Sequence, residues 1–215
     1  SETTEEVWIG NDGGILHSSD FMASHQNLNR GIQAVNLWGY DQGWNEDMMV
    51  AGRYHNGNMA YHENYPSGEF LALGGGEAAT GYVNYNDENE SLFSDIGGYR
   101  LPEDLSGNPE YFSVGMTPNE SYWNNGSSRI MFDNAYFNIA WLGKENSIYR
   151  SSNGGGSFSL LHSFGANADN SVLWIEQSYA NPEYIYAHQA VGNSSKLWRT
   201  TDHGATWAEI TLPQT

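Results

Sequence analysis

Acidic side chains are the residues of this chain that could do acid–base chemistry. The chain has no cysteine, and its 26 acidic residues face only eight basic ones. Hydrolysis of a glycosidic bond needs two carboxyl groups on opposite sides of a cleft, one of which is the acid. The candidates outside the predicted tight turns are Asp41, Glu46, Asp47, Glu77, Asp95 and Asp133. No single pair stands out, and most of these acids are expected to lie on the solvated surface.

Aromatic side chains in predicted loops could bind a ligand, because their faces stack on sugar rings or anchor protein partners. The best cluster is the segment Trp38-Gly39-Tyr40-Asp41-Gln42-Gly43-Trp44, where two glycines punctuate the end of a strand. The predicted ligand-binding residues are Trp38, Tyr40, Trp44, Tyr122 and Trp123, with Tyr65 as a further aromatic in a loop. For each ring, packing inside the fold is the alternative.

One oxygen-rich segment raises the question of a metal. Asn86-Asp87-Glu88-Asn89-Glu90 could hold Ca²⁺, although it lacks the spacing of an EF-hand, and a solvated turn is the alternative. The seven histidines form no paired zinc motif, and no glycine-rich segment opens a helix. The sequence therefore predicts no cofactor, with Ca²⁺ as the one open alternative.

Composition limits the class of partner and the location. The formal net charge of −18 repels nucleic acid and anionic membranes, so neither is expected as a partner. No apolar run approaches transmembrane length, which argues against membrane insertion. An acidic chain rich in Asn and aromatic residues is typical of an extracellular protein, secreted or on a cell surface.

The elements that position these residues are short strands and turns, because the chain is rich in glycine and aromatic residues. One turn recurs as Thr200 to Trp207, as Ser151 to Phe158 and, in degenerate form, from Ser18. The acid or amide accepts backbone N–H groups, the glycine takes positive φ, and the aromatic packs over the turn. The predicted structural residues are Ser18, Asp20, Ser151, Asn153, Gly155, Phe158, Thr200, Asp202, Gly204 and Trp207.

A longer repeat predicts the architecture. Val7-Trp8-Ile9-Gly10 matches Ala140-Trp141-Leu142-Gly143, and the match continues without a gap into the returning strands. Equivalent third-strand positions are Leu16, Ala60, Tyr99, Tyr149 and Trp198. A four-stranded antiparallel unit every forty to fifty residues is the signature of β-propeller blades. The chain is therefore predicted to be all-β, one propeller segment over 1–215, with about five blades at 1–37, 38–79, 80–125, 126–166 and 167–215.

At these turns the chain resembles the Asp-box (BNR) repeat family, which includes sialidases, xyloglucanase-type glycoside hydrolases and the sortilin/VPS10 propellers. The middle of the chain resembles the large secreted bacterial members at Gly52 to Gly57 and at Gly74-Gly75-Gly76-Glu77. Propellers of this family have six to ten blades. The resemblance therefore implies further blades, or another chain that closes the ring.

The resemblance also frames two functions. A sialidase needs three convergent arginines, and no family motif surrounds Arg30, Arg53, Arg100 or Arg129. A xyloglucanase-like enzyme needs a pair of loop carboxylates, which the sequence does not single out. We therefore expect a non-catalytic extracellular propeller, a recognition or scaffold module for a protein or glycan partner. The alternative is a fragment of a secreted glycoside hydrolase.

Overall fold

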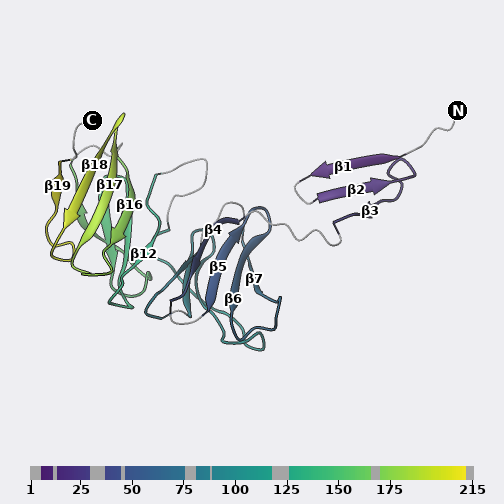
Figure 1. The fold of residues 1–215 in the computed structure, drawn as a ribbon, viewed down its shortest axis with the longest axis horizontal. Helices are drawn as coiled ribbons and strands as arrows, with labels where there is room; N and C mark the ends of the chain where they lie inside the picture. The colour runs from purple at the N-terminus through teal and green to yellow at the C-terminus, as the bar shows by residue number, and fades with distance from the viewer. Residues whose placement is uncertain are drawn as a thin grey trace. The chain divides into compact units, whose positions relative to one another are not determined.

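The computed structural model describes residues 6–11, 14–29, 37–44, 47–75, 81–87, 89–117, 126–165 and 170–211. All regular secondary structure in these ranges is β-strand (Figure 1). They contain no helix with the length and apolar character needed to span a membrane. The chain forms two compact units, Ser1–Asn36 and Leu37–Thr215.

The first unit is an antiparallel sheet of three strands in its described part. Its strands are β1 (Val7–Asn11), β2 (Gly14–Ser18) and β3 (Gln26–Asn27), in the order β1-β2-β3. Trp8 lies opposite His17 in the register, and the two rings are 4.2 Å apart. Trp8 is 60% exposed in this unit, whereas its sequence equivalent Trp141 is fully buried in the second unit.

In its described residues the second unit has four antiparallel sheets of four strands, and the strands of each sheet are consecutive in the chain. The first two sheets are β4 (Leu37–Gln42), β5 (Met48–Arg53), β6 (Gly57–His62), β7 (Leu71–Gly74), then β8 (Gly81–Val83), β9 (Glu90–Phe93), β10 (Gly97–Arg100), β11 (Glu110–Phe112). The last two are β12 (Met131–Phe132), β13 (Ala140–Lys144), β14 (Ser147–Ser151), β15 (Ser159–Ser163), then β16 (Val172–Gln177), β17 (Ile185–Val191), β18 (Ser194–Thr200), β19 (Ala208–Ile210).

This architecture is an all-β propeller, as the repeat predicts. The five third-strand positions fall on β2, β6, β10, β14 and β18. One detail differs, because the first sheet has three strands rather than four within the described residues.

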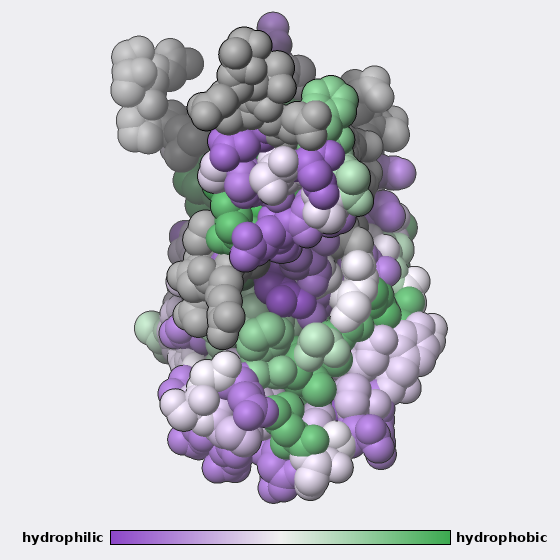
Figure 2. All heavy atoms as spheres, turned by 90° about the vertical axis from the view of Figure 1, so that its right-hand side faces the viewer, coloured by the Kyte–Doolittle hydropathy of each residue, from purple (hydrophilic) through white to green (hydrophobic). Residues whose placement is uncertain are grey.

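Apolar residues on both faces of the strands explain why the sheets of the second unit pack face to face. Three hydrophobic clusters lie between successive sheets, and each draws residues from both neighbours. One cluster contains Val50 and Phe93, the next contains Leu92 and Phe132, and the third contains Trp141 and Ile175. At the surface, hydrophobic residues are interspersed among hydrophilic ones (Figure 2).

The recurring turn is closed by hydrogen bonds within it. In the turn from Thr200, the hydroxyl donates to Asp202 Oδ1 at 2.7 Å and accepts from the N–H of Gly204 at 2.9 Å. Asp202 also accepts the N–H of Thr206 at 2.8 Å and its hydroxyl at 2.6 Å. These bonds, first that from the Thr206 hydroxyl and next that from Thr200, lower the pKa of Asp202 to about 2.

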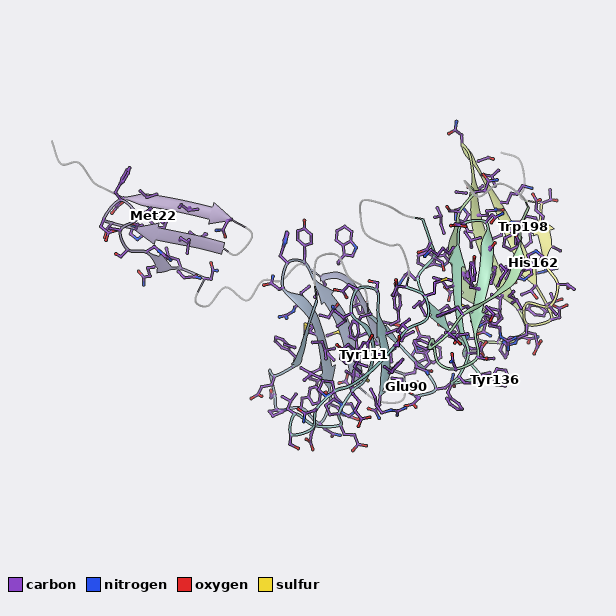
Figure 3. All side chains as sticks on the ribbon, turned by 180° about the vertical axis from the view of Figure 1, so that it is seen from behind. Met22, Glu90, Tyr111, Tyr136, His162 and Trp198 are labelled. Carbon is purple, nitrogen blue, oxygen red and sulfur yellow. The ribbon has the colours of Figure 1, made fainter. Side chains whose placement is uncertain are left out.

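The degenerate copy near Asp20 forms the same bonds without a glycine. Met22 lies in the turn between β2 and β3 (Figure 3). It has a φ of 71° and donates its N–H to Ser18 Oγ at 2.8 Å, where Gly204 has a φ of 88°. Asp20 accepts the Ser24 hydroxyl at 2.6 Å, as Asp202 accepts that of Thr206. The hydroxyl of Ser18 and the carboxylate of Asp20 therefore hold this turn without a glycine. Another residue can take the glycine position where its side chain has room.

Gly204 is different, because a Cβ there would lie 2.8 Å from Leu161 Cδ2 and 3.1 Å from the Trp141 ring. We expect Gly204→Ala to lower the free energy of unfolding by about 3 kcal/mol, from positive φ and overpacking together. Gly192→Ala is the matched control, since Gly192 also has positive φ but no atom within 4 Å of its Cβ position. Its expected loss in urea denaturation is about 1 kcal/mol. Equal losses for the two variants would contradict the packing role of Gly204.

Candidate functional site

The four sheets of the second unit present one loop each in the same structural position, between the first and second strands. Each loop is closed by a backbone bond, from Gly43 to Met48, Asn84 to Glu90, Asp133 to Ile139 and Ser178 to Tyr184. The residues that directly follow these four donors are Trp44, Tyr85, Asn134 and Tyr179. Because successive sheets pack face to face, equivalent loops gather at the ends of their first strands.

A cleft lies where these loops meet, which we call the central cleft. Its volume is about 80 Å³. It receives residues from all four sheets of the second unit. The lining residues are Asp41, Tyr85, Arg129, Ile130, Met131, Phe132, Asn134, Trp174, Ile175, Glu176, Gln177 and Tyr179.

Aromatic rings border this cleft. The Trp44 ring lies 5.1 Å from that of Tyr85 and 4.5 Å from that of Tyr179, so three sheets contribute to one aromatic surface. Trp44 and Tyr179 are each 56% exposed, and Trp174 is 50% exposed. Exposed, mutually braced rings can receive the flat face of a ligand with little loss of side-chain freedom.

Asp41 is a half-buried carboxylate with its hydrogen bonds supplied by the protein. It accepts the N–H of Val83 at 3.1 Å, the N–H of Gln42 at 3.0 Å and the hydroxyl of Tyr85 at 3.3 Å. Burial raises the pKa of Asp41, which these bonds and the charge of Arg129 only partly offset. Burial, together with the Asp41 charge, also raises the pKa of Tyr85.

Glu176 is the second carboxylate of the cleft. Asp41 and Glu176 both lie two residues before the donor that closes their loop, so they are equivalent positions of two sheets. Glu176 is exposed and accepts one hydrogen bond, from the Trp174 indole at 3.3 Å. Burial raises the pKa of Tyr179, and the charges of Glu176 and Asp41 raise it further.

Two donors in the cleft lack strong acceptors. Asn134 Nδ2 is buried and has no hydrogen-bond partner. The Arg129 guanidinium lies 5.3 Å from the Tyr82 ring and donates one long bond, of 3.4 Å, to the Tyr40 carbonyl. Within the described ranges no carboxylate forms an ion pair with Arg129. A buried donor without an acceptor costs about 1–3 kcal/mol, so a ligand or water oxygen would be favoured here.

Asp133 is not a surface acid, contrary to the expectation for the loop carboxylates. It is fully buried and accepts bonds from Trp141 Nε1, Gln177 Nε2 and His203 Nε2 at 3.1, 3.0 and 2.7 Å. Burial raises the pKa of Asp133, but hydrogen bonds from His203, Ala135 and Trp141 outweigh that effect and lower it overall. Asp133 therefore joins two neighbouring sheets and does not face the cleft.

The other residues that the sequence suggests fall in different places. Trp44 lies beside the central cleft, against its lining residues Tyr85 and Tyr179. The Trp38 ring instead stacks on Tyr54 at 6.1 Å, and Tyr40 is exposed on β4. Tyr65 is not an exposed loop aromatic, because it is 4% exposed and its hydroxyl donates to the Pro102 carbonyl. Asp47 is exposed, and Asp95 accepts a bond from Asn58. Glu46, Glu77, Tyr122 and Trp123 lie outside the described residues.

The acids of the segment considered for Ca²⁺ pair with a cation from the neighbouring strand β10. Arg100 forms ion pairs with Asp87, at 3.5 Å, and with Glu90. No group of three or more acidic or histidine side chains suited to a metal occurs in the described part of the chain, which omits Glu88. Calcium binding by this segment stays a prediction.

Sequence reasoning missed most of the cleft, namely Tyr85, Arg129, Asn134, Trp174, Glu176 and Tyr179. The sequence nevertheless contains a usable signal, since four of the aromatic and amide residues follow the first strand of successive repeats. Alignment of the repeats at that position makes Trp44, Tyr85, Asn134 and Tyr179 equivalent, and equivalent positions of successive blades are expected to lie close together.

Comparisons with known proteins agree with the propeller class. No family model and no curated protein sequence matches the chain. Among solved structures, it is similar to the GH74 enzyme of Niastella koreensis, with a TM-score of 0.57 and 14% identity over 97% of this chain and 36% of that one. An ancestral GH74 enzyme gives a TM-score of 0.53 and 14% identity, over 96% of this chain and 29% of that one.

A third similar structure is the extracellular domain of a candidate one component system from B. thetaiotaomicron. Its TM-score is 0.54 at 13% identity, over 97% of this chain and 26% of that one. At such identities the likeness shows the fold alone. The chain spans about a third or less of the length of these structures.

The buried pair of Asp133 and His203 gives a prediction about stability and pH. In Asp133→Asn, an amide faces three side-chain donors and two backbone N–H groups. We expect the free energy of unfolding at pH 7 to fall by about 2 kcal/mol. Because the folded pKa of Asp133 is lowered, its contribution is present above the ordinary value of about 3.9 and is lost as pH falls through the folded pKa. The two proteins should therefore converge in urea denaturation below about pH 4.

Asp47→Asn is the control, since it removes the same charge from an exposed position. A difference between wild type and Asp133→Asn that is unchanged from pH 7 to pH 3 would contradict the role of the carboxylate charge.

Proposed function

We propose that this propeller is an extracellular recognition module that binds a glycan in the central cleft. The observation that carries the proposal is the convergence of aromatic rings, carboxylates and poorly satisfied donors from four sheets on one cleft. Pockets that bind small polar ligands combine apolar walls with a few convergent polar groups. A sugar has apolar ring faces and hydroxyls that both donate and accept, which matches this combination.

The groups at the cleft would contact different parts of a sugar. The rings of Trp44, Tyr179 and Trp174 are exposed and would receive ring faces. Arg129 and Asn134 would donate to sugar oxygens, and Glu176 would accept from a hydroxyl. Asp41 would hold Tyr85 in place, because its oxygens already accept three bonds from the protein.

An extracellular location is part of the proposal. The formal net charge of −18 and the absence of cysteine suit a secreted or surface-displayed bacterial propeller. The likeness to the extracellular domain from B. thetaiotaomicron supports the same location. Because the chain spans about a third of its structural neighbours, we also propose that further blades or another chain complete the ring.

The first test is binding of two uncharged hexasaccharides, cellohexaose and chitohexaose, by isothermal titration calorimetry. We expect at least one of them to bind and Trp44→Ala to weaken that binding about tenfold or more, as loss of a central aromatic contact does at other interfaces. Phe137→Ala is the matched control, since Phe137 is 58% exposed but does not line the cleft. Binding that is insensitive to Trp44→Ala, or absent for both sugars, would contradict glycan recognition in this cleft.

Glycoside hydrolysis is the second candidate function. Asp41 and Glu176 line one cleft from two sheets, and burial raises the pKa of Asp41, as suits a general acid. The likeness to GH74 enzymes adds support at the level of the fold. The hydrogen bonds of Asp41 argue against hydrolysis. Its oxygens accept three bonds from the protein, which leaves little access for a leaving group.

We therefore expect the chain to bind without turnover. Incubation with either hexasaccharide should produce no new reducing ends in a reducing-sugar assay. The opposite result, release of reducing ends that Asp41→Asn and Glu176→Gln each abolish, would replace recognition by hydrolysis as the function of the cleft.

A further inference from the structure

We propose that the central cleft takes the acetamido group of an N-acetylhexosamine residue, so that the preferred glycan is an N-acetylated amino sugar polymer. This inference rests on the proposed glycan-binding function and names its ligand. It comes from the size of the cleft, from the identity of the polar groups that remain available in it, and from the charge of the chain.

The size of the cleft favours a substituent over a whole sugar ring. Its volume is about 80 Å³, whereas pockets that enclose small-molecule ligands are typically about 300–1,000 Å³. The exposed rings of Trp44 and Tyr179 lie beside it and provide the surface on which a pyranose ring could stack. A ring on that surface would direct one substituent into the cleft.

The two poorly satisfied donors of the cleft favour a ligand with a carbonyl oxygen. Asn134 Nδ2 is buried without a partner, and Arg129 has only a long bond to the Tyr40 carbonyl. Asn134 is held in place, because its backbone N–H donates to Gln177 Oε1 at 2.7 Å. An acetamido carbonyl has two lone pairs and can accept from both donors, which removes the cost of the unsatisfied amide.

The remaining groups match the rest of an acetamido group. Its N–H needs an acceptor, and Glu176 is exposed with one protein hydrogen bond, whereas Asp41 already accepts three. Its methyl group needs an apolar contact, and Ile130, Met131 and Ile175 line the same cleft. A hydroxyl group in this place could accept from both donors, but it has no methyl group and would leave the apolar wall without a contact.

Charge favours the neutral acetamido group over the substituents of charged sugars. A carboxylated sugar would pair with Arg129 but would meet Asp41, Glu176 and the field of a chain with a formal net charge of −18. A free amino sugar would be attracted by that field, yet its ammonium group cannot accept from Asn134 or Arg129. The neutral acetamido group avoids both conflicts.

The test compares three hexasaccharides with the same β-1,4-linked backbone that differ only at carbon 2. These are chitohexaose with acetamido groups, cellohexaose with hydroxyls, and the glucosamine hexamer with ammonium groups. We expect chitohexaose to bind wild type about tenfold or more tighter than cellohexaose, by calorimetry at about 0.15 M salt, where long-range attraction of the amine is screened. The glucosamine hexamer should bind no tighter than cellohexaose.

Asn134→Asp tests the named donor, since it replaces Nδ2 by an oxygen of nearly the same size and keeps the backbone bond to Gln177. We expect it to remove the preference for chitohexaose. Asn181→Asp is the control for added charge, because Asn181 lies in an exposed turn outside the cleft. If Asn134→Asp does not fold, the side-chain amide signal of Asn134 in wild type should shift with chitohexaose and not with cellohexaose.

The outcomes separate this inference from the proposed function. Equal affinity for chitohexaose and cellohexaose, with binding weakened by Trp44→Ala, would overturn the acetamido assignment and leave glycan recognition standing. Tightest binding of the glucosamine hexamer, lost in Glu176→Gln, would also overturn it. No binding of any of the three would defeat the glycan function itself.

Discussion

The structure of the second unit depends on apolar burial on both faces of its sheets. Each of the three clusters between successive sheets joins buried residues of both neighbours, such as Trp141 with Ile175 and Leu92 with Phe132. A sheet with two apolar faces is stable only when both are covered, because burial of apolar area is the main favourable contribution to folding.

Face-to-face packing has a direct consequence for the candidate site. When equivalent sheets succeed one another, their equivalent loops gather, and one sequence position per sheet becomes a shared surface. Trp44, Tyr85 and Tyr179 meet in this way, although more than ninety residues separate Tyr85 from Tyr179. The same packing brings Asp133 and His203, which come from two neighbouring sheets, within hydrogen-bond distance. The contact of Asp133 with His203 belongs to the scaffold, and the cluster around Trp44 borders the cleft that we propose as a binding site.

The difference between these two sets of polar groups lies in how fully they are satisfied. The Asp133 carboxylate accepts bonds from three side chains and two backbone N–H groups, so it has no capacity left for a ligand. In the central cleft, Asn134 Nδ2 has no acceptor and Arg129 has only a long bond. Unsatisfied donors cost stability unless something else satisfies them, and that imbalance distinguishes a binding surface from a structural network.

The sequence by itself determined the all-β propeller class, because turns and strand periods are local and repeat visibly at Ser151 to Phe158 and Thr200 to Trp207. It also marked the turn from Ser18 as a degenerate copy, in which Met22 takes positive φ at the glycine position. Tertiary structure decided which aromatics and acids meet. Trp44 packs against Tyr179 beside the cleft while Trp38 stacks elsewhere, and Asp133 is buried while Asp41 lines the cleft. Such meetings depend on how successive sheets pack, and a side chain's local sequence carries no record of its distant neighbours.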